Sequence, residues 1–229
     1  MTTSGTTNFN PALGEIVIHA FGMCGIRPTA LLQEHLESSR MAANLLLTTW
    51  SSRGVNLWKV ALETVPLVAG QATYSVPTNN ITMLDTYIST TTGSSTTDRL
   101  ILPVSRTEYA SYPNKAQTGF PTTYWQDRLL NGTVTLWPVP DGSQTSLKYY
   151  QVEQVYDANF TNGQTVDIPP YFLEAFALGM AYRLAIIWAP ERAQGLKMLA
   201  DESYQIAASQ NIEASDFFIS PTIGGYYRN

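Results

Sequence analysis

The sequence predicts an α+β fold that consists of a discontinuous antiparallel helix bundle, an inserted antiparallel β domain and an extended C-terminal arm. Apolar residues recur every three or four positions near both ends of the chain, which indicates helices. Between these two stretches, β-branched and aromatic residues are interrupted by turn formers, which is typical of antiparallel strands. The last residues combine aromatic side chains with Pro221 and Gly224-Gly225, which prevent a regular helix.

The first helix pair occupies residues 11–54. Pro11 suits a helix start, and Thr29 is placed to cap the second helix. The apolar face of the first helix is Leu13, Ile16, Val17, Ala20 and Phe21, and that of the second is Leu32, Leu36, Ser39, Ala43, Leu46 and Trp50. Neither helix pair can bury its stripe alone, so we expect the two pairs to pack together across the insert.

The insert covers residues 55–166 and is predicted to be rich in strands. We expect strands at 57–65, 72–76, 81–90, 99–103, 122–129, 133–137 and 146–156, and a short helix at 105–112. Turns are expected at 68–71, 77–80, 92–97, 131–132 and 140–142, with Asn131-Gly132 as the strongest hairpin signal.

The second helix pair spans residues 167–213 and the arm spans residues 214–229. Pro169-Pro170 begins the third helix, and Pro190 ends it and opens the fourth. The fourth helix is expected to bury Leu196, Leu199, Ser203, Ile206 and Gln210.

The composition indicates a folded protein with few charged residues. Charged residues make up 14% of the sequence, compared with about 25% in an ordinary soluble domain. Such a surface suits a subunit that is buried against neighbours. The net charge of −5 and the scattered basic residues give no footprint for phosphate backbones. With no signal peptide in residues 1–10 and no apolar run near 20 residues, we expect a soluble protein without a secretory address or membrane contact.

The sequence offers no convincing catalytic, cofactor or metal site, and we expect no enzyme activity. Cys24 and His19 form a conceivable dyad, but five residues place them on divergent helix faces, and a buried thiol with a surface imidazole is the simpler interpretation. A solvated helix face explains Asp201 and Glu202, and turn geometry explains Asp85, Asp98, Asp127 and Asp141. A single cysteine and two histidines give no ligand cluster for a metal.

Aromatic residues in the insert raise a second class of function. Trp58, Tyr74, Tyr87, Trp125 and Trp137 could form a platform for sugars or single-stranded nucleic acid. Packing in a core or subunit interface is the favoured interpretation.

Several segments, in this order, resemble the head-to-tail adaptor proteins of short-tailed bacteriophages, the portal-binding connectors similar to tail tubular protein A. The segments are residues 20–26, 42–54, 57–58, 70–77, 120–125, 134–140, 168–170 and 178–185. The resemblance implies a virion protein made in the host cytoplasm. It further implies a dodecameric ring that binds the portal, holds the tail nozzle or tail fibres, and lets genomic DNA pass without specific binding.

The resemblance also implies that the arm binds the portal. Its candidate contact residues are Phe217, Phe218, Ile219, Pro221, Ile223, Tyr226 and Tyr227. Two alternatives remain open from the sequence. One is another neck or tail protein, such as a stopper or nozzle subunit, and the other is a carbohydrate-binding or hydrolytic tail component.

Overall fold

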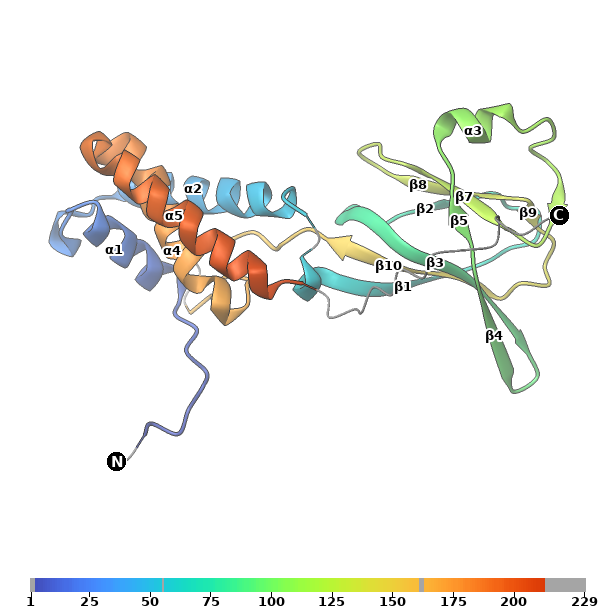
Figure 1. The fold of residues 1–229 in the computed structure, drawn as a ribbon, viewed down its shortest axis with the longest axis horizontal. Helices are drawn as coiled ribbons and strands as arrows, with labels where there is room; N and C mark the ends of the chain where they lie inside the picture. Colours follow the sequence, from blue (N-terminus) through green and yellow to red (C-terminus); the bar gives the residue numbers. More distant parts are fainter. Residues whose placement is uncertain (1–2, 55, 161–162, 213–229) are drawn as a thin grey trace, which may run out of the picture.

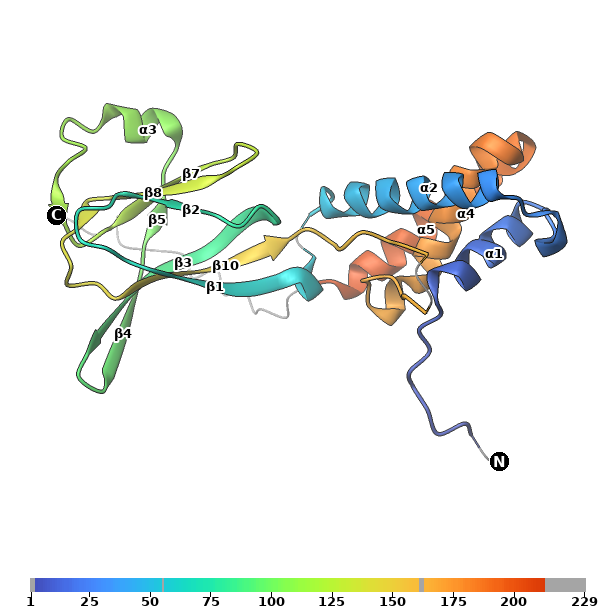
Figure 2. The ribbon, with the colours of Figure 1, turned by 180° about the vertical axis from the view of Figure 1, so that it is seen from behind.

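The computed structural model describes residues 3–54, 56–160 and 163–212. Within these residues the molecule is elongated, with its long helices at one end and its sheets at the other (Figures 1 and 2). Helices and antiparallel strands are both present, so the predicted α+β class is confirmed. The chain crosses from the helical end to the sheet end before β1 and returns after β10.

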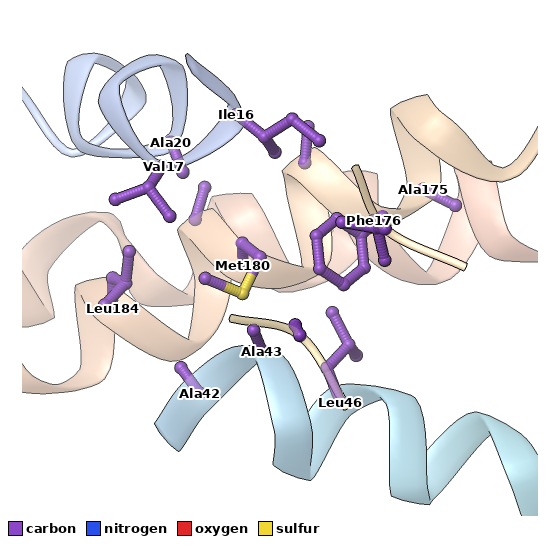
Figure 3. Close-up of a cluster of buried hydrophobic side chains, with 14 of the residues drawn as sticks. Ile16, Val17, Ala20, Ala42, Ala43, Leu46, Ala175, Phe176, Met180 and Leu184 are labelled. Atoms are coloured by element: carbon purple, nitrogen blue, oxygen red, sulfur yellow. The ribbon is translucent and has the colours of Figure 1, made fainter. Parts of the chain in front are cut away.

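The four long helices are α1 (Leu13–Met23), α2 (Gln33–Ser51), α4 (Leu173–Trp188) and α5 (Pro190–Gln210). Their buried side chains form one apolar core, in which α4 lies between α1 and α2 (Figure 3). Phe176 and Met180 of α4 are fully buried there. Gly179 lets α2 approach closely, because a Cβ at this position would lie 2.8 Å from Leu46 Cδ2.

The start of α2 differs from the prediction. Pro28–Ala30 forms a 3-10 turn, η1, so Thr29 does not cap the helix. The N-cap is Leu32, whose backbone N–H donates to His35 Nδ1 at 3.1 Å. Leu32 and Leu36 are exposed and His35 is buried in their place, stacked on Trp188 with ring centroids 4.2 Å apart. The expected stripe holds from Ser39 onward, where Ala43, Leu46 and Trp50 are buried as well.

The buried face of α5 also differs from the prediction. Leu196 is buried as expected, but Ala200 and Ala207 complete the face, while Leu199 and Ile206 are 51% and 63% exposed. Ala200 lies near Ala175 and Gly179 of α4. The two helices form a close antiparallel hairpin (Figure 1), in which small side chains fit. The large apolar residues of α5 therefore remain on its outer surface.

The strands form two four-stranded sheets and one two-stranded ladder. The first sheet has the order β1-β10-β3-β4, with β1 at Val60–Pro66, β10 at Ser146–Glu153, β3 at Asn80–Thr92 and β4 at Ser95–Leu100. The second has the order β2-β8-β7-β5, with β2 at Thr73–Ser75, β8 at Thr133–Trp137, β7 at Thr123–Asp127 and β5 at Leu102–Pro103. Side chains of both sheets, among them Ile88, Tyr124, Leu136, Leu147 and Tyr149, form a second core.

Most of the predicted strands and the hairpin at Asn131-Gly132 are confirmed, with four differences. Residues 57–59, expected to begin the first strand, form a 3-10 turn instead. The turn expected at 92–97 is confined to Gly93 and Ser94, because the Thr-rich residues that follow pair with β3. Two short ladders are parallel, β5 with β7 and β6 (Thr118–Gly119) with β9 (Val139–Pro140). Pro140, the last residue of β9, was expected in the turn at 140–142. The segment after β10 leaves the sheet at Glu153, and Val155, Ala158 and Val166 pack in the helical core.

Lys59 connects the two crossings between the regions. It lies in η2 (Leu57–Lys59), just before β1, and its Nζ is 2.8 Å from Asp167 Oδ2 on the returning chain. The same ammonium lies 4.0 Å from the ring centroid of Tyr156. The carboxylate also accepts a hydrogen bond from the Tyr156 backbone N–H. This partly buried ion pair holds the outgoing and returning segments together.

Candidate interaction surfaces

The outward faces of the helices carry large apolar side chains. Met41 and Leu45 are one turn apart on α2, and Leu199 and Ile206 are two turns apart on α5. All four are half-exposed or more. Ile186, Ile187 and Met198 are also exposed around the α4–α5 connection. Large apolar side chains that share an outward helix face are candidates for contact with other proteins. The sequence pattern of α5 already contained this surface, but periodicity alone did not separate the alanine face from the adjoining leucine and isoleucine face.

An apolar groove of about 410 Å³ lies between α1 and the first half of α4. Ile16, Met23, Leu173 and Ala177 line it, and Phe9 lies at one side. Glu15, His19 and Glu174 also contribute to its lining, so its apolar floor is bordered by groups that can be charged. The groove exists because α1 presents one helical face, residues 15, 16, 19 and 23, toward α4.

Of the aromatic residues considered as a binding platform, only Trp125 and Trp137 are brought together, through the rings of Tyr109 and Tyr112, whose centroids lie 6.0 Å apart. Trp58 packs on Phe172 of the helical core with ring centroids 4.8 Å apart, and Tyr74 is buried in the β core. Trp125 and Trp137 contact α3 (Arg106–Ser111) and its C-terminal flank. Trp125 stacks on Tyr109 at 5.4 Å, and Trp137 lies 4.2 Å from the Tyr112 ring. Packing within the subunit therefore accounts for four of the five.

The fifth aromatic residue, Tyr87, lies on the outer face of the first sheet. Its register partners are Lys148 on β10 and Leu100 on β4. Burial, followed by the nearby Tyr150 and Asp98, raises the pKa of Tyr87 above its ordinary value. This outer face is partly apolar and continues to both edges of the sheet.

Cys24 and His19 do not form a catalytic pair in this arrangement. The Cys24 thiol is buried and donates to the Ala181 carbonyl at 3.4 Å, whereas His19 is exposed on α1. Burial raises the pKa of the thiol above its ordinary value, although Arg192 opposes the shift. A nucleophilic cysteine needs the opposite shift, because the thiolate is the reactive form. The expected buried thiol and surface imidazole are confirmed.

The helix carboxylates lie on a solvated face as expected. Turn geometry, expected for four aspartates, explains only Asp141: Asp85 and Asp98 lie within strands β3 and β4, and Asp127 ends β7. Asp201 and Glu202 are exposed on α5. Asp141 accepts bonds from the Ser143 backbone N–H at 2.9 Å and hydroxyl at 2.7 Å, and these bonds lower its pKa. Asp98 accepts a hydrogen bond from Ser89 across the β3–β4 ladder. In the described part of the chain, no three His, Cys, Asp or Glu side chains gather as a metal site would require.

The expectation that no apolar run approaches the length of a membrane span is wrong for one helix. By length and composition, the helical segment Pro170–Trp188 is long and apolar enough to cross a membrane, and half of it is buried inside the protein. Its composition follows from its position between α1 and α2, where it faces protein on several sides. The predicted portal-binding residues of the arm, Phe217, Phe218, Ile219, Pro221, Ile223, Tyr226 and Tyr227, lie outside the described residues.

The protein has two regions with separate cores, joined by two crossings, and its helices carry large apolar side chains on their outward faces. The family model of the SU10 adaptor proteins matches residues 34–216, from the start of α2 past the end of α5. The chain therefore belongs to the SU10 adaptor protein family of phage head-to-tail adaptors and is a structural component of the virion neck. A comparison with curated proteins gives no match.

Proposed function

We propose that this protein forms a ring of twelve copies that joins the portal to the tail nozzle and continues the DNA channel. The exposed apolar faces of α2 and α5 carry the proposal. Leu199 and Ile206 stay outside the subunit's own core, where the close packing of α5 admits only small side chains such as Ala200. Burying a leucine or isoleucine removes apolar area from water and contributes roughly 1.5–3 kcal/mol when burial is complete. Lateral contact between copies supplies that burial.

The double substitution Leu199→Ser with Ile206→Ser tests this interface. Both side chains lie outside the helical core, so the isolated subunit should keep its thermal transition within a few degrees. Ring formation on purified portal should be lost, as measured by native mass spectrometry and electron microscopy. A matched control is Leu129→Ser with Leu130→Ser in the β7–β8 hairpin, where both leucines are also exposed. Rings that survive the first pair of substitutions contradict the interface.

The arm is the proposed portal contact. Residues 214–229 contain seven apolar or aromatic candidates, and Pro221 with Gly224-Gly225 prevents their burial in a regular helix. An extended arm that becomes ordered on a partner would couple attachment to assembly. A variant that ends at Ala214 should keep its helical circular dichroism and fail to bind portal. Unimpaired binding by that variant would refute the arm's role.

DNA is proposed to pass through the channel without binding tightly. The net charge of −5 argues against a lining of basic side chains, and each phosphate contact would add salt-dependent affinity that slows passage. Purified rings should show no duplex binding at micromolar concentration and physiological salt, measured by fluorescence anisotropy.

We also propose that the protein resembles the connectors of short-tailed phages, and that the side of the ring away from the portal holds the tail nozzle or tail fibres. A stopper or nozzle subunit is less well supported, because the family match begins in the helical region and includes both α4 and α5. A carbohydrate-binding or hydrolytic role has less support still, because Trp125 and Trp137 pack on tyrosines of the α3 segment. Electron microscopy of the protein mixed with purified portal separates these roles. A ring beneath the portal supports the adaptor, and binding only to assembled tails favours the alternative.

A further inference from the structure

The first sheet has two open edges, and its two edge strands run in opposite directions. All three of its ladders are antiparallel, so the edge strands β1 and β4 run in opposite directions. Within the described part of the chain, β1 pairs only with β10 and β4 only with β3. A second copy related by rotation about a ring axis can therefore place its β1 beside β4 in the antiparallel sense. Two edges that ran in the same direction would meet in the parallel sense instead.

The strand β4 lacks strong protection against such pairing. All six of its residues are exposed, and the β3–β4 hairpin projects away from the second sheet (Figure 1). Its first half, Ser95-Thr96-Thr97, has no charge, no proline and good strand propensity. Natural proteins usually protect long exposed edges with charges, prolines or bulges, because an open edge is a template for another strand. The charges that β4 does carry, Asp98 and Arg99, lie in its second half.

The registers of the sheet fix which face each edge residue belongs to. Arg99 pairs with Ile88, which pairs with the fully buried Leu147, so Arg99 belongs to the core-side face. Glu63 pairs with the fully buried Tyr149 and belongs to the same face. On the opposite face, Leu100 of β4 is 60% exposed and Leu62 of β1 is 47% exposed. Each edge thus carries one charge toward the core side and one exposed leucine on the outer side.

We propose that β4 of one copy pairs antiparallel with β1 of the next copy, with Arg99 opposite Glu63 and Leu100 opposite Leu62. This proposal rests on the ring of the proposed function. Registers that keep both sheet faces aligned differ by steps of two residues. A step in one direction would oppose Arg99 to Val65, and a step in the other would oppose it to Ala61. Only the proposed register pairs the opposite charges and the two leucines together, and such cross-strand pairs stabilise a sheet.

The register also has the stagger that a closed sheet requires. Within one copy, Arg99 lies in the same row as Ile88, Leu147 and Val65. The proposed contact joins it to Glu63 of the next copy, two residues along β1 from that row. Strands that close into a barrel must tilt, and they acquire the tilt through such a stagger. The proposed contact thus joins the first sheets of the ring into one continuous sheet.

Disulfide cross-linking tests the pairing with the full chain. Leu62→Cys and Leu100→Cys are combined in a Cys24→Ser background and oxidised in assembled portal complexes. Within one copy, β1 and β4 are separated by two strands, so the two thiols are too far apart to join. The expected result is a ladder of covalent oligomers. The control joins Leu100→Cys with Tyr150→Cys, which lies beside Leu62 on the interior strand β10 and should give no ladder.

Charge exchange gives a second readout that does not depend on new thiols. Arg99→Glu and Glu63→Arg should each lower ring occupancy on portal about fivefold or more, and the double variant should restore it. Because Arg99 lies 4.9 Å from the Phe120 ring, the thermal transition of each isolated variant is measured as well.

The outcomes separate this inference from the proposed function. Rings without a ladder overturn the strand pairing and leave the adaptor ring intact. Linked dimers from Leu100→Cys alone would show two-fold pairing of β4 with β4 and overturn it too. If the protein forms no ring with portal by electron microscopy, the proposed function itself has failed.

Discussion

The helical region and the β region bury their side chains in different ways. The helical core draws on segments from both ends of the chain, from Leu13 to Ala207, and the polar side chains buried in α2 include His35 and Ser39. The β core is smaller, and polar side chains such as Thr86, Ser89 and Gln151 are buried around it. Helices satisfy their backbone groups internally, so their free surface offers side chains, whereas an open sheet also offers unpaired backbone groups at its edges. Neighbouring copies can therefore be bound by side chains in one region and by strand pairing in the other.

The difference also concerns the order in which the chain must come together. Residues of the β region are contiguous in sequence, while the helical core needs α1 and α2 to meet α4 and α5 across the whole insert. The loop-closure entropy of that meeting increases with the length of the insert. The helical region should therefore depend on the β region being folded more than the reverse.

The largest expected effect comes from Phe176→Ala in the centre of the helical core. The side chain is fully buried in the helical core (Figure 3), and its ring centroid lies 6.0 Å from that of Trp50. Its loss should lower the free energy of unfolding by about 3–5 kcal/mol, and hydrogen exchange should show the helices losing protection before the sheets. The matched change in the β core, Leu136→Ala, should lower protection in both regions. Equal loss in both regions from Phe176→Ala would contradict the proposed dependence.

Helix positions and most strands could be predicted from the sequence because their signals are local. Spacing of apolar residues gave α1, and Pro190 marked the boundary between α4 and α5. The buried face of α5 could not be predicted, because Leu199 and Ala200 are adjacent and only the closeness of α4 selects the smaller side chain. The cap at Leu32 was missed for a similar reason, since His35 is positioned by Trp188 from the other end of the chain.

The candidate surfaces were harder to predict than the fold. The turn at Gly93 looked longer in the sequence, because serine and threonine suit turns as well as edges, and only pairing with β3 makes residues 95–97 a strand. Strand order and register depend on long-range pairing that one sequence does not display. That Arg99 and Glu63 lie on opposite edge strands of one sheet follows only from this strand order.

A smaller effect is expected where the two regions join. Lys59 is 7% exposed and its partner Asp167 is 34% exposed. Lys59→Met removes the ammonium that binds the carboxylate and packs on the Tyr156 ring, and it should lower the free energy of unfolding by about 1–3 kcal/mol, since Asp167 regains only part of its hydration. Urea unfolding measures the change, and Lys148→Met on the outer face of the sheet serves as the control. If the variant retains wild-type stability, the ion pair does not hold the crossings together.

The smallest effect at neutral pH is expected from Tyr149→Phe in the β core. The Tyr149 hydroxyl is buried and has no hydrogen-bond partner among the described residues. A buried hydroxyl without a partner is costly, so its removal should raise the free energy of unfolding by about 1 kcal/mol. Tyr150→Phe, on the neighbouring position that faces outward, should change stability very little.

The same variant makes the comparison of the two regions sharper at alkaline pH. Burial, together with the nearby Glu63 carboxylate, raises the pKa of Tyr149 from 10 to about 12 in the folded protein. In the unfolded chain the phenol loses its proton near pH 10, so the wild type loses stability as pH increases from 10 to 12, by about 2–3 kcal/mol from this group. Phenylalanine has no proton to lose. The stability difference between Tyr149→Phe and wild type should therefore grow across this interval, and Tyr87, Tyr124 and Tyr171, which titrate in both proteins, cancel in the subtraction. Urea unfolding at pH 9, 10, 11 and 12 measures it, and a difference that stays constant with pH would mean that water reaches Tyr149 and that the β core is more open than the helical one.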